Sequence, residues 1–176
     1  MTGEPARRAY LAPTLLRPEH VIDDFHCASE ELTSWLTTHA RSSSGGGFTK
    51  VFVVTEVGSR NVVGYYAWTM AAVLPPNAPP RVTHGGGLHP VPVALLARLA
   101  VDTRHEGGGI GSSMLRDVVT RAATVGSGIG CRGLLVHCEN SAARQFYTNR
   151  IPDFVPSPSD PLHLYLLMKT MRALGA

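Results

Sequence analysis

Apolar positions in the first half of the chain recur with two different periods. Ser29 is a good N-cap residue, and acidic residues follow it in the first turn, where a helix dipole favours negative charge. From Leu32 to Ala40 the apolar residues fall at helical spacing on one face, which predicts a helix packed on a core. The segments 51–57 and 62–73 are rich in β-branched and aromatic residues and flank a turn-forming cluster. This pattern predicts an antiparallel hairpin.

The second half of the chain is patterned around a buried strand and the helix that follows it. Residues 92–101 form a nearly continuous apolar run, which is typical of a strand covered on both faces. A turn rich in glycine comes next, and apolar residues then recur at helical spacing from Ile110 to Ala122. Beyond this helix we predict a strand, a helix and a strand, over 133–137, 141–149 and 162–168.

The order of these elements predicts the fold class. Irregular chain is expected in a flexible leader over 1–13 and in glycine- or proline-rich loops over 41–47 and 75–90. With a short first strand at 14–16, the order is strand, helix, three strands, glycine turn and helix, then strand, helix and strand. This predicts an α/β (α+β) fold with a mixed, mostly antiparallel sheet, as a single domain over 14–176.

Composition narrows the class of protein. The 176 residues are 44% hydrophobic and 16% charged, so the chain is globular rather than disordered. No apolar run approaches the length of a membrane span, and the N-terminus lacks the apolar segment of a secretory signal. We therefore predict no membrane partner and a cytoplasmic protein. The net charge of +3 is a mild bias toward polyanions.

Cysteine and histidine spacing gives no sign of a metal centre. The three cysteines, Cys27, Cys131 and Cys138, are far apart and form no C-x-x-C pair, so neither a disulfide framework nor a zinc site is indicated. The eight histidines show no ligand spacing, and we predict no metal. Cys138 has two interpretations, a small buried thiol and a nucleophile.

The glycine turn after the central strand is the clearest candidate site. Arg104 precedes glycines at 107, 108, 109 and 111, and a helix follows. The start of a helix leaves backbone N–H groups without internal partners, and the helix dipole makes that end partly positive. Glycine lets the backbone approach a ligand closely. The turn therefore predicts a seat for a phosphate or a pyrophosphate, although it lacks the G-K-[ST] ending of a P-loop.

The pattern Arg104-x-x-Gly107-x-Gly109-x-Gly111 resembles the R/Q-x-x-G-x-G/A signature of the GNAT acetyltransferases. From about residue 16 onward the chain is similar to that family, and several stretches are similar to its tRNA-acetylating toxins from bacterial type II toxin–antitoxin systems. These stretches are F-H-C at 25–27, L-T-S-W-L at 32–36, V-V-G-Y-Y-A at 62–67, P-V-A-L-L-A-R-L-A-V-D at 92–102, R-G-L-L-V-H at 132–137 and F-V-P-S-P-S-D-P-L-H-L at 154–164. The resemblance implies the GNAT fold, with helices flanking the sheet and a V-shaped splay for acetyl-CoA.

The resemblance also implies roles for individual residues. Backbone groups near the end of the central strand would bond the pantetheine arm, and amides of the glycine turn would hold the pyrophosphate. The residues expected at the acetyl-CoA site are Leu99, Ala100, Val101, Arg104, His105, Glu106, Gly107, Gly108, Gly109, Ile110, Gly111, Ser112 and Asn140. Glu106 stands where relatives usually carry glutamine, and its carboxylate is expected to point outward. Tyr147 matches the general acid of the family, since a phenol is protonated at neutral pH and can supply a proton to a thiolate. A packed tyrosine whose hydroxyl bonds a carbonyl is the alternative.

A tRNA substrate requires a basic surface, because backbone phosphates supply most of the affinity. The candidate residues are Arg41, Lys50, Arg81, Arg98, Arg144 and Arg150, and a solvated side chain is the alternative for each. Arg98 also interrupts the apolar run of the central strand, which is expensive unless the charge is paired. A salt bridge to an acidic residue is therefore its other interpretation.

The resemblance thus implies transfer of acetyl from acetyl-CoA to the α-amine of an aminoacyl-tRNA, which would block translation. The resemblance further implies a ribbon–helix–helix antitoxin as a protein partner and leaves a homodimer open. Two alternatives remain: the same chemistry on a protein amine or a small-molecule amine, and a non-catalytic module that binds coenzyme A or a partner.

Overall fold

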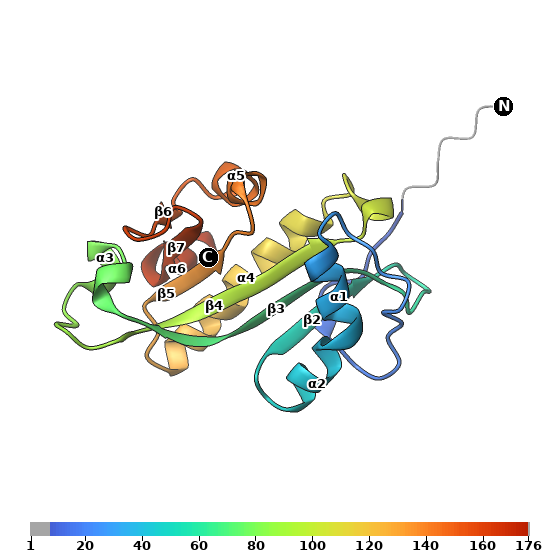
Figure 1. Cartoon of the computed structure of the whole chain (residues 1–176), viewed down its shortest axis with the longest axis horizontal. Helices are drawn as coiled ribbons and strands as arrows, with labels where there is room; N and C mark the ends of the chain where they lie inside the picture. The colour runs from blue at the N-terminus through green and yellow to red at the C-terminus, as the bar shows by residue number, and fades with distance from the viewer. Residues whose placement is uncertain (1–7, 176) are drawn as a thin grey trace. The chain divides into compact units, whose positions relative to one another are not determined.

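The computed structural model describes residues 8–175 (Figure 1). The elements are β1 (Thr14–Leu15), α1 (Glu30–Thr38), α2 (Ala40–Gly45), β2 (Lys50–Thr55), β3 (Val62–Val73), the 3₁₀ helix η1 (Pro75–Asn77), α3 (Pro80–Thr83), β4 (Val91–Val101), the 3₁₀ helix η2 (Thr103–His105), α4 (Ile110–Gly128), β5 (Gly133–His137), α5 (Ser141–Arg150), β6 (Val155–Pro156), β7 (His163–Leu167) and α6 (Met168–Leu174).

The seven strands form one mixed sheet in the order β1-β2-β3-β4-β5-β7-β6. β4 and β5 are parallel, with the register running from Ala94 opposite Leu134 to Leu96 opposite Val136. β5 pairs with β7 in the antiparallel sense, as do β1 with β2 and β6 with β7. The predicted class, a mixed sheet with flanking helices, is confirmed. The predicted V-shaped splay stays a prediction.

Residue contacts divide the described chain into two compact units. Unit 1 comprises the described residues up to Ala67 together with Arg98–Met114, and unit 2 comprises Trp68–Ala97 and the described residues from Leu115 onward. The strands β3 and β4 and the helix α4 contribute residues to both units. That residues 14–176 act as a single domain remains a prediction.

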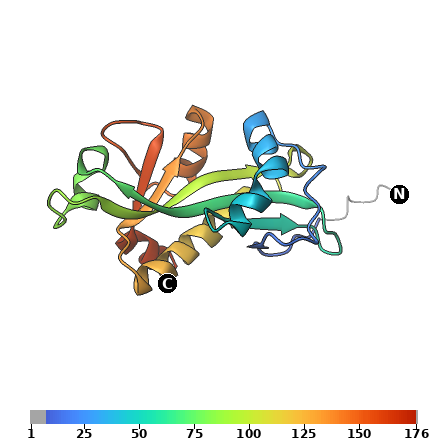
Figure 2. The same ribbon diagram turned by 60° about the horizontal axis from the view of Figure 1, so that its bottom comes forward.

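The core of unit 1 is aromatic. Tyr65 of β3 is fully buried, stacks on Trp35 of α1 with ring centroids 6.0 Å apart, and meets the edge of Phe25 at 5.5 Å. Helix α1 begins as predicted, because the Ser29 side chain accepts a hydrogen bond from the Leu32 N–H. The helices α1 and α2 contact each other, and α2 contacts β2 (Figure 2).

Unit 2 has its own core, to which the short helix α3 contributes Val82. Val93, Leu135 and Tyr165 bring together β4, β5 and β7, and α6 packs against β5 and β7. The Arg132 side chain donates to the carbonyl oxygens of residues 81 and 82 in α3 and of residue 84 just after it, and so connects α3 to the start of β5.

Several predicted loops contain regular structure. The loop over 41–47 is helical as far as Gly45, where Ser42 Oγ donates to the His39 carbonyl oxygen. The loop over 75–90 contains η1 and α3, and proline opens both, since the first residues of a helix need no N–H donor. Helix α4 continues to Gly128, beyond the apolar pattern that ends at Ala122, and β6 and α6 were not predicted.

The expected leader also differs from the structure. Residues 1–7 lie outside the described part of the chain. From Ala9 to Leu11 the backbone instead pairs with residues 55–57, through bonds from the Leu11 N–H to the Thr55 oxygen and from the Val57 N–H to the Ala9 oxygen. Within residues 8–175, no helix combines the length and apolar character needed to cross a membrane.

Candidate functional site

The glycine turn joins the end of β4 to the start of α4. Gly107 and Gly109 both have a φ of +78°, a left-handed conformation that L-residues rarely adopt, so glycine is required at these positions by the backbone. A Cβ built on either glycine would meet nothing within 4 Å, and both residues are exposed. The turn therefore presents open backbone directly before a helix of 19 residues, which is the geometry of an anion seat.

The other residues predicted at this anion seat lie at the end of β4, in the turn and at the start of α4. Ala100 and Ile110 are buried, Leu99 and Val101 are half-buried at the end of β4, and Glu106 is exposed, as its expected outward orientation requires. Gly111 and Ser112 occupy the first turn of α4, which contains no acidic residue. The chain at this seat thus offers backbone amides without a competing carboxylate in the first turn of the helix.

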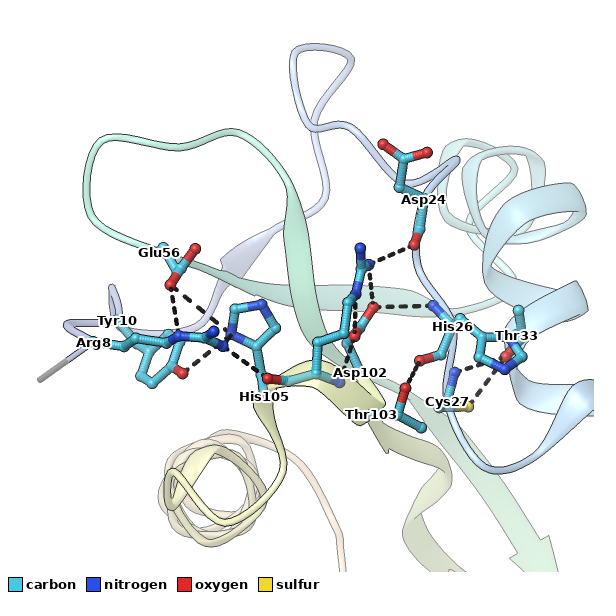
Figure 3. Close-up of polar contacts among 11 residues, drawn as sticks. Arg8, Tyr10, Asp24, His26, Cys27, Thr33, Glu56, Asp102, Thr103 and His105 are labelled. Carbon is cyan, nitrogen blue, oxygen red and sulfur yellow. Dashed lines mark hydrogen bonds and ion pairs between the residues drawn. The ribbon is translucent and has the colours of Figure 1, made fainter. Parts of the chain in front are cut away.

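Arg104 differs from its expected role. Its guanidinium pairs with the carboxylate of Asp102 through Nη2 at 2.7 Å and Nε at 2.9 Å, and Nη2 also donates to the Asp24 carbonyl oxygen at 2.7 Å (Figure 3). Asp102 has no exposed side-chain surface, whereas the Arg104 side chain is 61% exposed. The guanidinium is therefore bound to a buried partner rather than held free for a pyrophosphate.

Asp102 organises the backbone around the turn. It accepts hydrogen bonds from the backbone N–H groups of Arg104, the second residue of η2, and of His26, which belongs to a distant segment (Figure 3). The hydrogen bond from the Arg104 side chain, the bonds from the two backbone N–H groups and the charge of Arg104 hold the pKa of the Asp102 carboxyl well below its usual range, against the opposing effect of burial. The sequence analysis missed Asp102, although its position directly after the strand and two residues before an arginine was a usable signal.

Replacing Asp102 by asparagine is expected to lower the free energy of unfolding by about 2 kcal/mol, because the buried carboxylate loses its charge-assisted hydrogen bonds to the Arg104 side chain and to backbone N–H groups. A carboxyl whose pKa is lowered by folding contributes stability above its unfolded pKa, near ~4, and loses it as the pH falls toward the folded pKa. The gap between wild type and D102N is therefore expected to be constant from about pH 5 to pH 8 and to narrow below about pH 4.

Urea unfolding followed by circular dichroism at each pH measures this gap. The matched control is Asp117→Asn, which breaks the partly exposed i,i+4 pair with Arg121 and should cost less than about 1 kcal/mol. An Asp102 variant no less stable than the control would contradict the structural role assigned to this carboxylate.

The candidate general acid lies in α5. Asn140 caps this helix, with its side-chain oxygen accepting from the Ala143 N–H at 2.9 Å, so its amide NH₂ remains for other contacts. Tyr147 is 6% exposed and packs edge-on against Phe146 and Phe154, with ring centroids 5.1 and 6.0 Å away. Burial raises the pKa of the Tyr147 phenol above its ordinary value, and the group therefore stays protonated at neutral pH.

Two further groups of unit 2 bear on the chemistry. Burial raises the pKa of the Cys138 thiol to about 11, so the thiol is protonated at neutral pH, which disfavours the nucleophile interpretation. His137 stacks on His163 with ring centroids 4.0 Å apart. Partial burial and the neighbouring His163 lower the His137 pKa, so this imidazole is neutral and able to accept a proton at pH 7.

The predicted basic residues do not form one cluster within either unit. In unit 1, Arg41 and Lys50 line a surface cavity of about 590 Å³ together with Arg17, and the Arg41 guanidinium donates to the carbonyl oxygens of Arg17 and His20. In unit 2, a surface cavity of about 840 Å³ contains Arg81 and three other basic side chains, namely Arg132, Lys169 and Arg172. Sequence reasoning missed these three and Arg17.

The remaining arginines make aromatic contacts. The Arg98 guanidinium carbon lies 4.4 Å from the ring centroid of Trp35, so a cation–π contact replaces the salt bridge considered as an alternative. Arg150 lies in the same way over Phe146 at 3.8 Å. The Nε atoms of Arg98 and Arg144 are buried and have no hydrogen-bond partner among the described residues. Across the same residues, no group of three or more His, Cys, Asp or Glu could hold a metal.

Comparison with known proteins identifies the family to which this chain belongs. Residues 14–150 match the acetyltransferase (GNAT) family. This match covers well over half of the chain, so the chain belongs to the GNAT family and is an acetyl-CoA-dependent N-acetyltransferase. It is 40% identical over 165 residues to the tRNA-acetylating toxin of Mycobacterium tuberculosis, covering 94% of this chain and 96% of the relative.

Solved structures agree on the fold. The AtaT toxin complexed with acetyl-methionyl-tRNAfMet matches with a TM-score of 0.83 at 21% identity, covering 94% of this chain and 99% of that one. A tyrosine-to-phenylalanine mutant of AtaT, bound to acetyl-CoA and to the C-terminus of the antitoxin AtaR, matches with a TM-score of 0.77 at 21% identity, covering 93% and 96%.

Proposed function

We propose that this chain is a toxin that acetylates the α-amine of an aminoacyl-tRNA and so blocks translation in the cytoplasm. The observation that carries the proposal is the 40% identity, over 94% of the chain, to a relative named as a tRNA-acetylating toxin. An N-acetylated aminoacyl-tRNA has no free amine with which to extend a peptide.

The acetyl donor fits the residues at the glycine turn. The open backbone over Gly107 and Gly109 leaves room for a diphosphate, and the N-terminus of α4 favours its negative charge. Backbone groups of Leu99 and Val101 at the end of β4 would bond the pantetheine arm in the manner of an added strand, and the amide of Asn140 would contact it. When bound, acetyl-CoA supplies the activated acyl group.

The residues proposed for proton transfer belong to unit 2. As the amine nitrogen bonds to the acetyl carbon, the carbon–sulfur bond breaks and the thiolate takes a proton, which the protonated phenol of Tyr147 would supply. An aminoacyl ester amine is less basic than a lysine, so much of it is unprotonated near neutral pH and ready to attack. The proton that the amine releases on forming the amide would pass through water to the neutral imidazole of His137.

The nucleic acid is attracted by basic side chains. Arg17, Arg41 and Lys50 share the cavity of unit 1, where they suit contacts with backbone phosphates. Arg81 contributes in the same way from the cavity of unit 2. We further propose a ribbon–helix–helix antitoxin as the protein partner, in line with the antitoxin-bound relative.

The proposal is tested by supplying labelled acetyl-CoA together with charged tRNA, a peptide and a polyamine in one reaction. We expect label on the α-amine of the esterified amino acid, detected by mass spectrometry after nuclease digestion, and none on deacylated tRNA. Label on the peptide or the polyamine with untouched tRNA would support the alternative acceptors. Binding of acetyl-CoA without transfer to any amine would support the non-catalytic alternative.

A further inference from the structure

The segment before β1 is fixed beside the glycine turn. Its backbone bonds to residues 55–57, at the end of β2, place the side chains of Arg8 and Tyr10 next to His105 (Figure 3). None of these contacts was predicted, since they join residues almost a hundred positions apart in the chain.

Arg8 and Tyr10 contact three residues of the turn, Arg104, His105 and Gly108. Arg8 Nη1 donates to the Arg104 carbonyl oxygen at 2.7 Å and to His105 Nδ1 at 3.2 Å. The Tyr10 hydroxyl lies 3.1 Å from the same Nδ1, and its ring meets the imidazole edge-on at 5.8 Å. The Tyr10 ring also lies over Gly108, because a Cβ added to Gly108 would be 3.3 Å from a carbon of that ring.

These contacts indicate which ring nitrogen of His105 accepts hydrogen bonds. A guanidinium cannot accept a hydrogen bond, so Nδ1 of His105 is the acceptor and the ring proton resides on Nε2. The His105 side chain is only 11% exposed, and the Glu56 carboxylate lies 3.9 Å from both Nδ1 and Arg8 Nε. His105 is thus held on two sides by side chains that belong to other segments of unit 1.

We propose that Arg8 and Tyr10 are positioning residues for the diphosphate of the acetyl donor, an inference that rests on the proposed function. The turn contains three adjacent glycines, and an unrestrained glycine backbone would lose much conformational entropy on binding an anion. Arg8, Tyr10 and His105 together are here called the clamp. The clamp contacts this turn at its η2 end and orders the turn backbone before the donor binds. Arg8 and Tyr10 act through the backbone and not by contact with the acetyl group.

The test compares Tyr10→Phe and Tyr10→Ala with wild type, using acetyl-CoA and S-acetylpantetheine as donors. With acetyl-CoA, we expect KM to rise about threefold in Y10F, which loses one hydrogen bond, and about tenfold in Y10A, with kcat nearly unchanged. S-acetylpantetheine lacks the diphosphate, so both variants should use it as wild type does. A general loss of structure would instead affect both donors.

Tyr65→Phe is the matched control, because it removes another tyrosine hydroxyl bond of unit 1, to the Leu32 carbonyl oxygen, away from the turn. Melting temperatures of all variants identify any that fail to fold, and Y10F, which keeps the ring, retains the test in that case. An acetyl-CoA KM unchanged in both Tyr10 variants, or raised equally for both donors, overturns the clamp alone. A wild-type protein without acetyl-CoA binding overturns the proposed function and the clamp together.

Discussion

Replacing Tyr147 by phenylalanine is expected to lower kcat by about 10²- to 10³-fold while changing the Kd for acetyl-CoA less than about twofold. The substitution removes only the hydroxyl, and the ring contacts with Phe146 and Phe154 remain. The leaving thiolate would then have to take its proton from water. Single-turnover acetylation of charged tRNA measures the chemical step directly.

Tyr165→Phe is the control for this variant. Tyr165 is also buried in unit 2, and its hydroxyl donates to the Asn77 carbonyl oxygen, so its removal tests the general cost of a lost tyrosine hydroxyl. The same pair can be compared in cells, where expression of Y165F should still arrest growth and expression of Y147F should not. Undiminished growth arrest by Y147F would show that Tyr147 is a packed residue without a catalytic role.

Replacing Gly109 by valine is expected to weaken acetyl-CoA binding at least about tenfold. A side chain at a φ of +78° forces the turn out of its conformation, at about 1–2 kcal/mol, and it also occupies the open space where a diphosphate would lie. The two effects add, because one distorts the amides and the other blocks access to them.

Gly128→Val is the matched variant, since Gly128 lies at the other end of α4, is exposed and has neither a positive φ nor a neighbour within 4 Å of an added Cβ. Calorimetric titration with coenzyme A should give a wild-type Kd for G128V and a weakened one for G109V. Equal affinity in the two variants would show that the anion seat is elsewhere.

Local features of the fold were predictable because they are set by neighbouring residues. The strand over 133–137 was predicted with the bounds that the structure shows, and the cap by Ser29 follows from a side chain and an N–H three residues apart. The helix over 40–45 was missed because its serines and glycine favour loops on average, whereas here it packs against α1 and β2.

The candidate site was predictable in its backbone and not in its side chains. The glycines of the turn were identified because their spacing reflects a backbone requirement, which the positive φ angles of Gly107 and Gly109 confirm. The hydrogen bond from Arg104 to the Asp24 carbonyl oxygen, and the contacts of Tyr10 with His105, depend on segments brought together only by the fold. A sequence motif predicts an arginine at a position but does not identify the acidic residue with which that arginine pairs.

Titration calorimetry of the purified protein with acetyl-CoA and with S-acetylpantetheine tests whether the open amides before α4 hold the diphosphate of the acetyl donor. We expect saturable binding of acetyl-CoA, with an affinity at least about a hundredfold higher than that of the donor without a diphosphate. No heat with acetyl-CoA, or equal affinity for the two donors, would contradict it.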